Sequence, residues 1–239
     1  MVYAILPLKD FVNAKQRLGG VLAPHERRGF FQAMVEDVLD VLSQHELIEQ
    51  VVILSDDPCA EFLAERYQVK HWSEKSLKAT GLNGVISAAA KKLAEQGINN
   101  LMIVHGDLPL ISHQEIQQLV ETHQLSAQPA VTISPDTAMQ GTNCMLCSPP
   151  DVINFYYGEN SLSKHGEEAK RCNITANVVP QSGLSCDMDN PADIEVLLAS
   201  EKTLKHSFRY LIDNGIAGRL SAMSIGDITI APAIGEAEL

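Results

Sequence analysis

Three aspartates have the residue type and spacing of a site for a divalent cation. Asp187 and Asp189 lie two residues apart in a segment with extended character, which would place both carboxylates on one side, about 6–7 Å apart. Asp107 lies three residues after the short apolar run 101–104, where a strand would end. Mg²⁺ favours one or two carboxylates together with substrate phosphates, so the three residues predict a magnesium site. The alternative is that Asp189 or Asn190 caps the helix expected after Pro191.

The loop near the start of the chain is basic and could bind phosphate. It contains Lys9, Lys15 and Arg17, and residues 1–28 hold five basic against two acidic side chains. Lysine neutralises the charge of oxyanions and arginine binds them through paired hydrogen bonds, so the loop is typical of a phosphate-binding site. A solvated loop without a ligand is the alternative that charge alone leaves open. Neither G-x-x-x-x-G-K-[ST] nor G-x-G-x-x-G occurs in the chain, which argues against P-loop and dinucleotide-binding proteins.

Small, hydroxyl and amide residues gather at two further places, 141–143 and 158–165. They let a backbone approach an anion closely and donate hydrogen bonds to it, although they are also ordinary turn residues. Asn83 opens a predicted helix, where its side chain could cap the helix or contact a nucleotide base.

These residues must be positioned by a scaffold in which short apolar runs alternate with amphipathic helical patterns, which is typical of a parallel α/β sheet. Strands are predicted at 2–7, 51–54, 69–72, 101–104, 130–134, 143–147 and 176–179. Helices are predicted from residue 24 to about 42, at 59–67, 82–96, 115–123 and 162–172, and after residue 191, with 73–80 as a loop. Past residue 201 we expect one amphipathic helix and a final strand at 225–231. Ligands bind beyond the carboxyl ends of parallel strands, which is where the basic loop and Asp107 fall.

Composition narrows the class of protein. The 239 residues are 45% hydrophobic and 20% charged, which is ordinary for one globular domain, with or without an appendage. A net charge of −12 disfavours a nucleic-acid binder. No apolar run reaches the roughly 18 residues that would span a membrane, and the first residues lack the basic start of a signal peptide, so a cytoplasmic protein is expected.

The five cysteines are an odd, scattered set, which argues against a disulfide framework. Cys144 and Cys147 have the spacing of a zinc or redox pair. In a strand, however, an offset of three sends two side chains to opposite faces, and no second pair follows. We therefore expect two structural cysteines.

Taken in order, the motifs resemble those of the guanylyltransferase family of the coenzyme F420 pathway. The resemblance covers about residues 1–200, and residues after about 201 fall outside it. The matching residues are Pro7, Lys9, Ala14, Lys15, Arg17 and Leu18, then Gly81-Leu82-Asn83, Asp107-Leu108-Pro109, Gly141-Thr142-Asn143, Pro149-Pro150, Gly158, Ser161, His165, Asp187, Asp189, Pro191 and Asp193.

The resemblance implies an α/β, single-domain nucleotidyltransferase fold of the nucleotide-diphospho-sugar transferase type, with a mostly parallel mixed sheet. It implies transfer of GMP from GTP to a small phosphorylated three-carbon acid, with release of pyrophosphate. The acid would be 2-phospho-L-lactate, phosphoenolpyruvate or 3-phospho-D-glycerate. Residues 1–200 would form the catalytic domain, and 201–239 an extension that packs on this domain or on a second subunit, where it could pair two copies.

The resemblance also assigns residue roles. Magnesium would be held by Asp107, Asp187 and Asp189. The nucleotide would contact Leu6, Pro7, Lys9, Lys15, Arg17, Asn83 and Asp107, of which Lys9, Lys15, Arg17 and Asp107 would act in catalysis. The phosphorylated acid would contact Thr142, Asn143, Gly158, Ser161 and His165. Tyr157, Leu162 and Cys144 depart from the family pattern beside the acid site, so the sequence leaves the acceptor open.

Two alternatives remain at this point. One is a molybdenum-cofactor-type nucleotidyltransferase, a related class that usually carries a Gly-Gly pair before its basic residues, whereas Gly19-Gly20 here follows Arg17. The other is a nucleotide-binding partner protein that keeps the fold without chemistry. The three aspartates and the two lysines of the basic loop argue against it. No Ser/His/Asp or Cys/His arrangement for a covalent intermediate is evident, which agrees with direct transfer to an already ionised phosphate.

Overall fold

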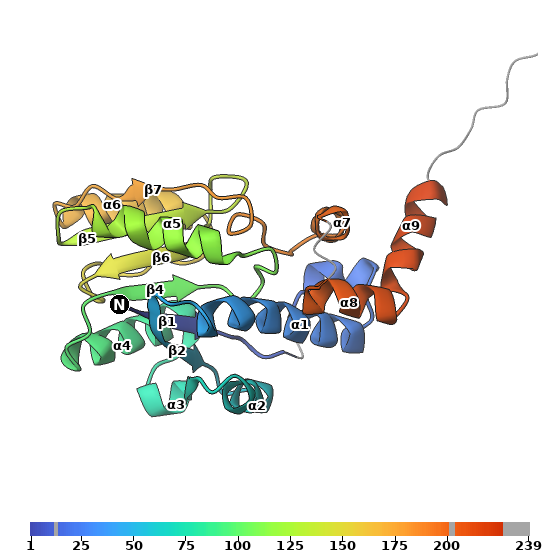
Figure 1. The fold of residues 1–239 in the computed structure, drawn as a ribbon, viewed down its shortest axis with the longest axis horizontal. Helices are drawn as coiled ribbons and strands as arrows, with labels where there is room; N and C mark the ends of the chain where they lie inside the picture. The colour runs from blue at the N-terminus through green and yellow to red at the C-terminus, as the bar shows by residue number, and fades with distance from the viewer. Residues whose placement is uncertain (12–13, 201–203, 227–239) are drawn as a thin grey trace, which may run out of the picture.

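A computed structural model describes residues 1–11, 14–200 and 204–226. Its centre is a seven-stranded sheet with the order β3-β2-β1-β4-β6-β5-β7 (Figure 1). The strands are β1 (Val2–Pro7), β2 (Ile48–Leu54), β3 (Lys70–Trp72), β4 (Leu101–Val104), β5 (Ala130–Pro135), β6 (Thr142–Ser148) and β7 (Asn177–Val178). Neighbouring strands are parallel except that β6 is antiparallel to both β4 and β5. The expected mostly parallel mixed sheet is confirmed.

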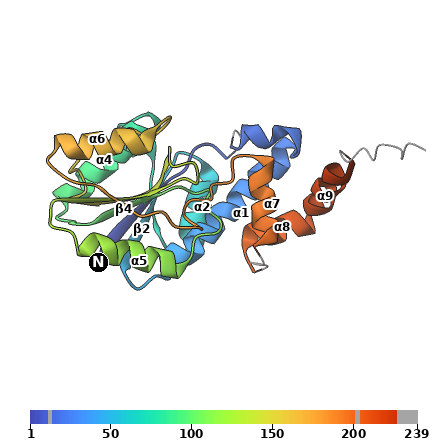
Figure 2. The same cartoon turned by 90° about the horizontal axis from the view of Figure 1, so that it is seen from above.

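Helices cover both faces of this sheet, with α4 and α6 on one face and α1 and α5 on the other (Figure 2). The helices are η1 (Gln16–Gly20), α1 (Pro24–Ser43), α2 (Pro58–Arg66), α3 (Glu74–Leu77), α4 (Gly81–Glu95), α5 (His113–Gln124), α6 (Ser161–Arg171), α7 (Pro191–Ala199), α8 (His206–Asp213) and α9 (Ile216–Gly226). None of the helices in these described segments is long and apolar enough to cross a membrane.

Strand alternation divides the core into two clusters. In β1, Ala4 and Leu6 pack with α1, whereas Ile5 packs with α4. Because successive side chains of a strand point to opposite faces, a sheet covered on both sides needs apolar residues at every position. Cys144 and Cys147 follow the same rule: both are buried and free, one in each cluster, as expected.

Two predicted segments differ from the structure. The expected loop 73–80 contains the one-turn helix α3, which begins where the Ser73 hydroxyl accepts a hydrogen bond from the backbone N–H of Ser76 at 3.1 Å. So short a helix has no apolar stripe from which it could be predicted. Beyond residue 204 the chain forms two helices in place of one, separated at Gly215, whose φ of +67° favours glycine. Positions 225 and 226 of the expected final strand belong to α9, and 227–231 lie outside the described residues.

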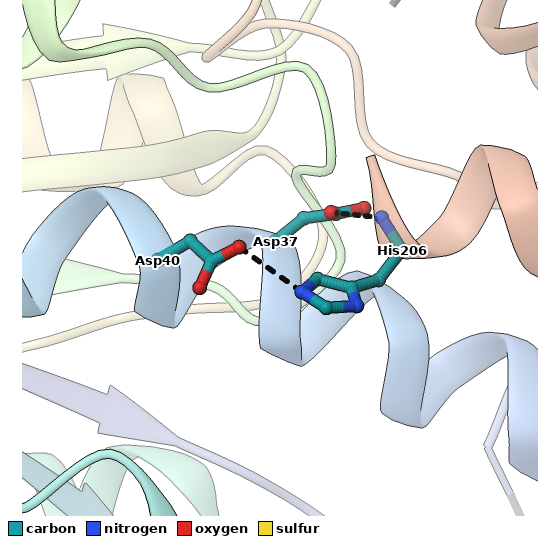
Figure 3. A group of neighbouring side chains, drawn as sticks. All are labelled: Asp37, Asp40 and His206. Carbon is teal, nitrogen blue, oxygen red and sulfur yellow. Dashed lines mark hydrogen bonds and ion pairs between the residues drawn. The ribbon is translucent and has the colours of Figure 1, made fainter. Parts of the chain in front are cut away.

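The C-terminal helix α8 is anchored on α1 by one carboxylate. Asp37 accepts hydrogen bonds from the backbone N–H groups of His206 and Ser207, at 2.6 and 3.0 Å, and from the Ser207 hydroxyl. The ring Nε2 of His206 lies 3.0 Å from Asp40 (Figure 3). Asp37, Asp40 and His206 bring three potential metal-ligand atoms together, but Asp37 is already used by the first turn of α8. The group therefore serves to dock the helix.

Candidate active site

A cavity of about 710 Å³ opens at the carboxyl ends of β1 and β4. Because β6 runs antiparallel to β4, the start of β6 lies at this same edge. Eleven of the fourteen predicted site residues line the cavity: Pro7, Lys9, Lys15, Arg17, Asp107, Thr142, Asn143, Gly158, Ser161, Asp187 and Asp189. Another hollow of about 610 Å³, beside the start of β5, has no charged side chain in its lining.

Lys15 joins the basic loop to the aspartates. Its ammonium nitrogen lies 2.5 Å from Asp107 Oδ2 and 2.7 Å from Asp189 Oδ1, and the side chain is only 6% exposed. The exposed Arg17 guanidinium reaches Asp189 Oδ2 at 3.3 Å. The backbone of Lys15 has φ +54°, a conformation that is uncommon for residues other than glycine and that begins the short helix η1. The loop is thus shaped to turn this lysine inward.

Charge pairing overrides burial in setting the charge states here. Burial by itself would lower the pKa of Lys15, but the carboxylates of Asp107 and Asp189 outweigh it, and the pKa lies above its usual value. Burial would raise the pKa of Asp107, but the Lys15 ammonium outweighs it, and that pKa lies below its usual value. The ammonium and the Asp107 carboxylate are therefore both charged at neutral pH.

The segment 187–189 is held against the turn after β4. The backbone N–H of Met188 donates to the carbonyl of Asp107 at 3.1 Å, and the Met188 side chain is fully buried in the core. The residues on either side of it, Asp187 and Asp189, both face the cavity, as their offset of two predicts. Asn143 fixes Asp187 by donating from its amide to Asp187 Oδ1 at 3.1 Å.

Capping of α7 uses neither of these two carboxylates. Asp193 accepts from the backbone N–H groups of Asp189 and Asn190, at 2.9 and 2.7 Å. The N-cap residue of α7 is Asn190, and Asp193 forms the capping box with it, so of the two expected caps Asn190 is confirmed and Asp189 is wrong. Burial, and then the negative charge of Asp107, raises the pKa of Asp187, which marks a crowded acidic corner.

The opposite wall of the cavity is rich in hydrogen-bond donors and carries one carboxylate, Asp136, beside Gly141. Thr142 begins β6, and Ser161 begins α6, where the first turn of a helix favours an anion. Gly158 has φ +123°, which is strained for any residue with a side chain, so the backbone can follow this wall only with glycine there. The wall can accept an anionic group opposite the aspartates.

Three predicted site residues do not line the cavity. The Leu6 side chain is fully buried in the core of the sheet. The Asn83 amide pairs with the backbone of Tyr157, accepting from its N–H at 2.7 Å and donating to its carbonyl at 3.1 Å. His165 lies behind Thr142, fully buried. Asn83 and His165 therefore support the wall and do not form its surface. Asn83 lies 74 residues from Tyr157 in sequence and His165 lies 23 residues from Thr142, so neither contact follows from local sequence.

His105 is a cavity residue that the sequence did not single out. It lies two residues before Asp107, and its ring packs edge-on against Tyr157 with centroids 5.1 Å apart. Its Nε2 has no hydrogen-bond partner among the described residues, and burial lowers the pKa of the ring. A polar residue directly after an apolar strand was the available signal, since such positions reach the ligand edge of the sheet.

Comparison of the sequence with known proteins identifies the family of this chain. The family model described as guanylyl transferase CofC-like matches residues 2–231. The chain belongs to this guanylyltransferase family. The match extends well past residue 200, so the helices α8 and α9 fall within the family sequence, contrary to the expectation that the resemblance ends there.

Curated relatives of this guanylyltransferase carry two different names. Phosphoenolpyruvate guanylyltransferase of Rubrobacter xylanophilus is 31% identical over 199 residues, 83% of this chain and 94% of the relative. 2-Phospho-L-lactate guanylyltransferase of Methanothermobacter thermautotrophicus is 30% identical over 209 residues, 87% of this chain and 88% of the relative. The chain is a nucleotidyltransferase, and a molybdenum-cofactor enzyme or a partner protein without chemistry is not favoured.

Solved structures support the fold of the guanylyltransferase. A protein of Desulfovibrio desulfuricans G20, provisionally described as a nucleotide-diphospho-sugar transferase, superposes with a TM-score of 0.74 at 17% identity, covering 92% of this chain and 97% of that one. A 4-diphosphocytidyl-2C-methyl-D-erythritol synthase gives 0.56 at 12% identity, covering 82% and 96%. The expected nucleotide-diphospho-sugar transferase fold is confirmed.

Proposed function

We propose that this guanylyltransferase moves GMP from GTP to a small phosphorylated three-carbon acid, with release of pyrophosphate, as a step of coenzyme F420 biosynthesis. One observation carries the proposal. A single cavity joins a cationic loop (Lys9, Lys15 and Arg17) to acidic residues, and both face the hydroxyl groups of Thr142 and Ser161, which can bind an anion. Such a cavity suits two phosphorylated substrates that meet end to end.

The transfer needs positioning and neutralisation of charge. A phosphate oxygen of the acid attacks the α-phosphorus of GTP, a new phosphorus–oxygen bond forms, and the bond to the pyrophosphate oxygen breaks. The attacking phosphate is already ionised, so no general base is required, and both ring nitrogens of His165 are in any case engaged. Lys9, Lys15 and Arg17 would neutralise the phosphates of GTP, and Thr142 and Ser161 would hold the acid.

Magnesium is the cation we propose for the acidic corner. Asp107 Oδ1 is buried and has no hydrogen-bond partner among the described residues, which fits a carboxylate made to bind a further group. Asp107, Asp187 and Asp189 would hold the ion, with Asn143 fixing Asp187. In the described part of the chain their ligand atoms do not all lie within 4.8 Å of one another, so the ion would have to draw the carboxylates together. When bound, Mg²⁺ would supply positive charge to the phosphates of GTP during the transfer.

A direct assay identifies the phosphorylated acid that accepts GMP. Pyrophosphate release is measured with GTP, ATP or CTP, Mg²⁺, and one of phosphoenolpyruvate, 2-phospho-L-lactate or 3-phospho-D-glycerate, with reactions lacking the acid as controls. We expect release with GTP and one of the acids, together with a product that contains GMP linked to that acid. No acid-dependent release with any of the nine pairs would contradict the proposal.

We further propose that the enzyme acts in the cytoplasm with these soluble substrates, and that it could pair as a homodimer. Sedimentation of the full chain over a range of concentrations would measure the assembly. A monomer at micromolar concentration would contradict the pairing and leave the activity proposal untouched.

A further inference from the structure

We propose that His165 is a positioning residue that fixes the direction of the Thr142 hydroxyl, so that Thr142 donates its proton to an anionic oxygen of the phosphorylated acid. The inference rests on the proposed function, because it concerns the wall assigned to the acid. It gives His165 a role through another residue, in place of direct contact with the substrate.

The hydrogen bonds around the His165 ring assign its tautomer. The backbone N–H of Tyr156 donates to His165 Nε2 at 2.9 Å. A ring nitrogen that accepts a hydrogen bond carries no proton, so the single proton of the neutral ring must lie on Nδ1. Burial lowers the pKa of His165 to about 4, which keeps the ring neutral near pH 7.

The tautomer in turn decides what Thr142 can do. His165 Nδ1 lies 3.0 Å from Thr142 Oγ1, so Nδ1–H donates and the hydroxyl oxygen accepts. The hydroxyl proton is then excluded from that direction. Thr142 lines the cavity, and the described residues supply no other hydrogen-bond partner for its hydroxyl, so the proton is available to a ligand.

The direction of this proton has a large consequence for an anionic ligand. A hydroxyl that donated to the histidine would present an oxygen lone pair to the cavity and would repel a phosphate or carboxylate oxygen. A hydroxyl that accepts from the histidine attracts the same group, and hydrogen bonds to charged groups are the stronger class. The Nε2 bond also ties Tyr156 in place just before Tyr157 and Gly158, so one ring orders two parts of the wall.

The tautomer can be measured on the unaltered protein. Long-range ¹H–¹⁵N spectra of histidine-labelled full chain at pH 7 should show the His165 ring with Nδ1 protonated and Nε2 unprotonated. The resonance is assigned by its absence in a His165 variant. An Nε2-protonated ring, or a ring that titrates near pH 6.5, would overturn the inference without any activity assay.

A matched pair of variants tests the consequence for the substrate. His165→Asn places an amide near the Nδ1 position and can still donate to Thr142, whereas His165→Gln places its amide near the Nε2 position and can serve only Tyr156. Both lose the ring that packs on Tyr157. We expect His165→Gln to raise the KM for the acid by about tenfold or more and to leave the KM for GTP within about twofold of the unaltered enzyme. We expect His165→Asn to raise the KM for the acid much less, because it keeps the donor to Thr142.

Thr142→Val separates failure of the inference from failure of the proposed function. Valine keeps the shape of threonine without the hydroxyl, and we expect the acid KM of Thr142→Val/His165→Gln to equal that of Thr142→Val alone. Equal losses in the Gln and Asn variants, or additive losses in the double variant, would overturn the role of His165. An unchanged acid KM in Thr142→Val would instead contradict the acid site of the proposed function.

Discussion

The ammonium group of Lys15 allows two carboxylates from distant parts of the chain to lie in one partly buried corner. Removing charges from water is unfavourable unless an opposite charge is close, and Lys15 lies within 2.7 Å of both Asp107 and Asp189. The same two carboxylates are among the ligands we propose for Mg²⁺. If the proposal holds, the lysine and the divalent cation would compete for these carboxylates.

Lys15→Met should separate these two roles. We expect the free protein to bind Mn²⁺ more tightly than the unaltered chain, because no ammonium competes, while turnover falls by about 10²–10³-fold for lack of the charge. Mn²⁺ affinity is measured by titration calorimetry without nucleotide. Lys91→Met, at an exposed position on α4, is the matched control. Unchanged Mn²⁺ affinity would mean that the lysine and the metal do not compete for these carboxylates.

Asp107→Asn and Asp189→Asn should each lower turnover by about three orders of magnitude or more, because an amide binds neither the lysine nor a cation strongly. Asp151→Asn, at an exposed turn, removes the same charge without effect. Turnover is followed as pyrophosphate release with Mg²⁺, and EDTA should abolish it in the unaltered enzyme. Near-normal activity of both variants would remove the proposed metal assignment.

At the scale of elements, buried histidines join helices to the sheet. His123 of α5 lies 2.9 Å from Thr132 on β5 and 2.7 Å from Ser148 on β6, through its two ring nitrogens. His165 joins α6 to β6 in the same way through Thr142. Burial lowers the pKa of both rings to about 4, so the fold depends on their neutral form.

Stability should therefore fall in mild acid. In the unfolded chain both histidines have pKa values of about 6.5, so between pH 6.5 and pH 4 the unfolded state binds more protons. The free energy of unfolding should drop as pH falls through this window, by at most about 1.4 kcal/mol per pH unit for each histidine. Urea unfolding at several pH values measures the slope. His123→Gln should flatten it, and an equal slope in that variant would contradict the assignment.

At the scale of the whole molecule, the C-terminal helices continue the main core. Leu211, Ile216 and Leu220 are buried in the cluster that contains α1, and Arg219 pairs with Glu26 at the start of α1 at 2.8 Å. Asp37 anchors the first turn of α8 to the middle of α1. Within this chain the described part of the extension therefore has a packing partner.

Ending the chain after Ser200 should expose this apolar face. Burial of a leucine or isoleucine side chain contributes about 1.5–3 kcal/mol, so loss of three should cost a large part of a typical stability of about 5–15 kcal/mol. We expect a much lower urea midpoint for the shortened chain. Ile212→Ala, at a position 50% exposed, is the control and should change the midpoint little. An unchanged midpoint after truncation would show that residues 201–239 do not stabilise the domain.

The sequence by itself determined the sheet and most of the cavity. Apolar runs and helical periodicity are local properties, so the strands and the longer helices could be predicted from neighbouring residues, and α3 could not. The motif residues reached the carboxyl edge of the sheet because strand ends are local features too. His105 was missed because a single polar residue after a strand is as typical of an ordinary turn as of a ligand site, although its position at the strand end was a signal.

Only the tertiary structure decided what each side chain touches. Lys15 contacts Asp107, 92 residues away in sequence, and Asp189, 174 residues away. No residue close to Lys15 in the sequence indicates either contact. Asn83 and His165 were assigned to ligands but hydrogen-bond to the wall of the cavity. The physical reason is that a polar side chain takes its role from the donors and acceptors within about 3 Å, and folding supplies those from distant segments of the chain.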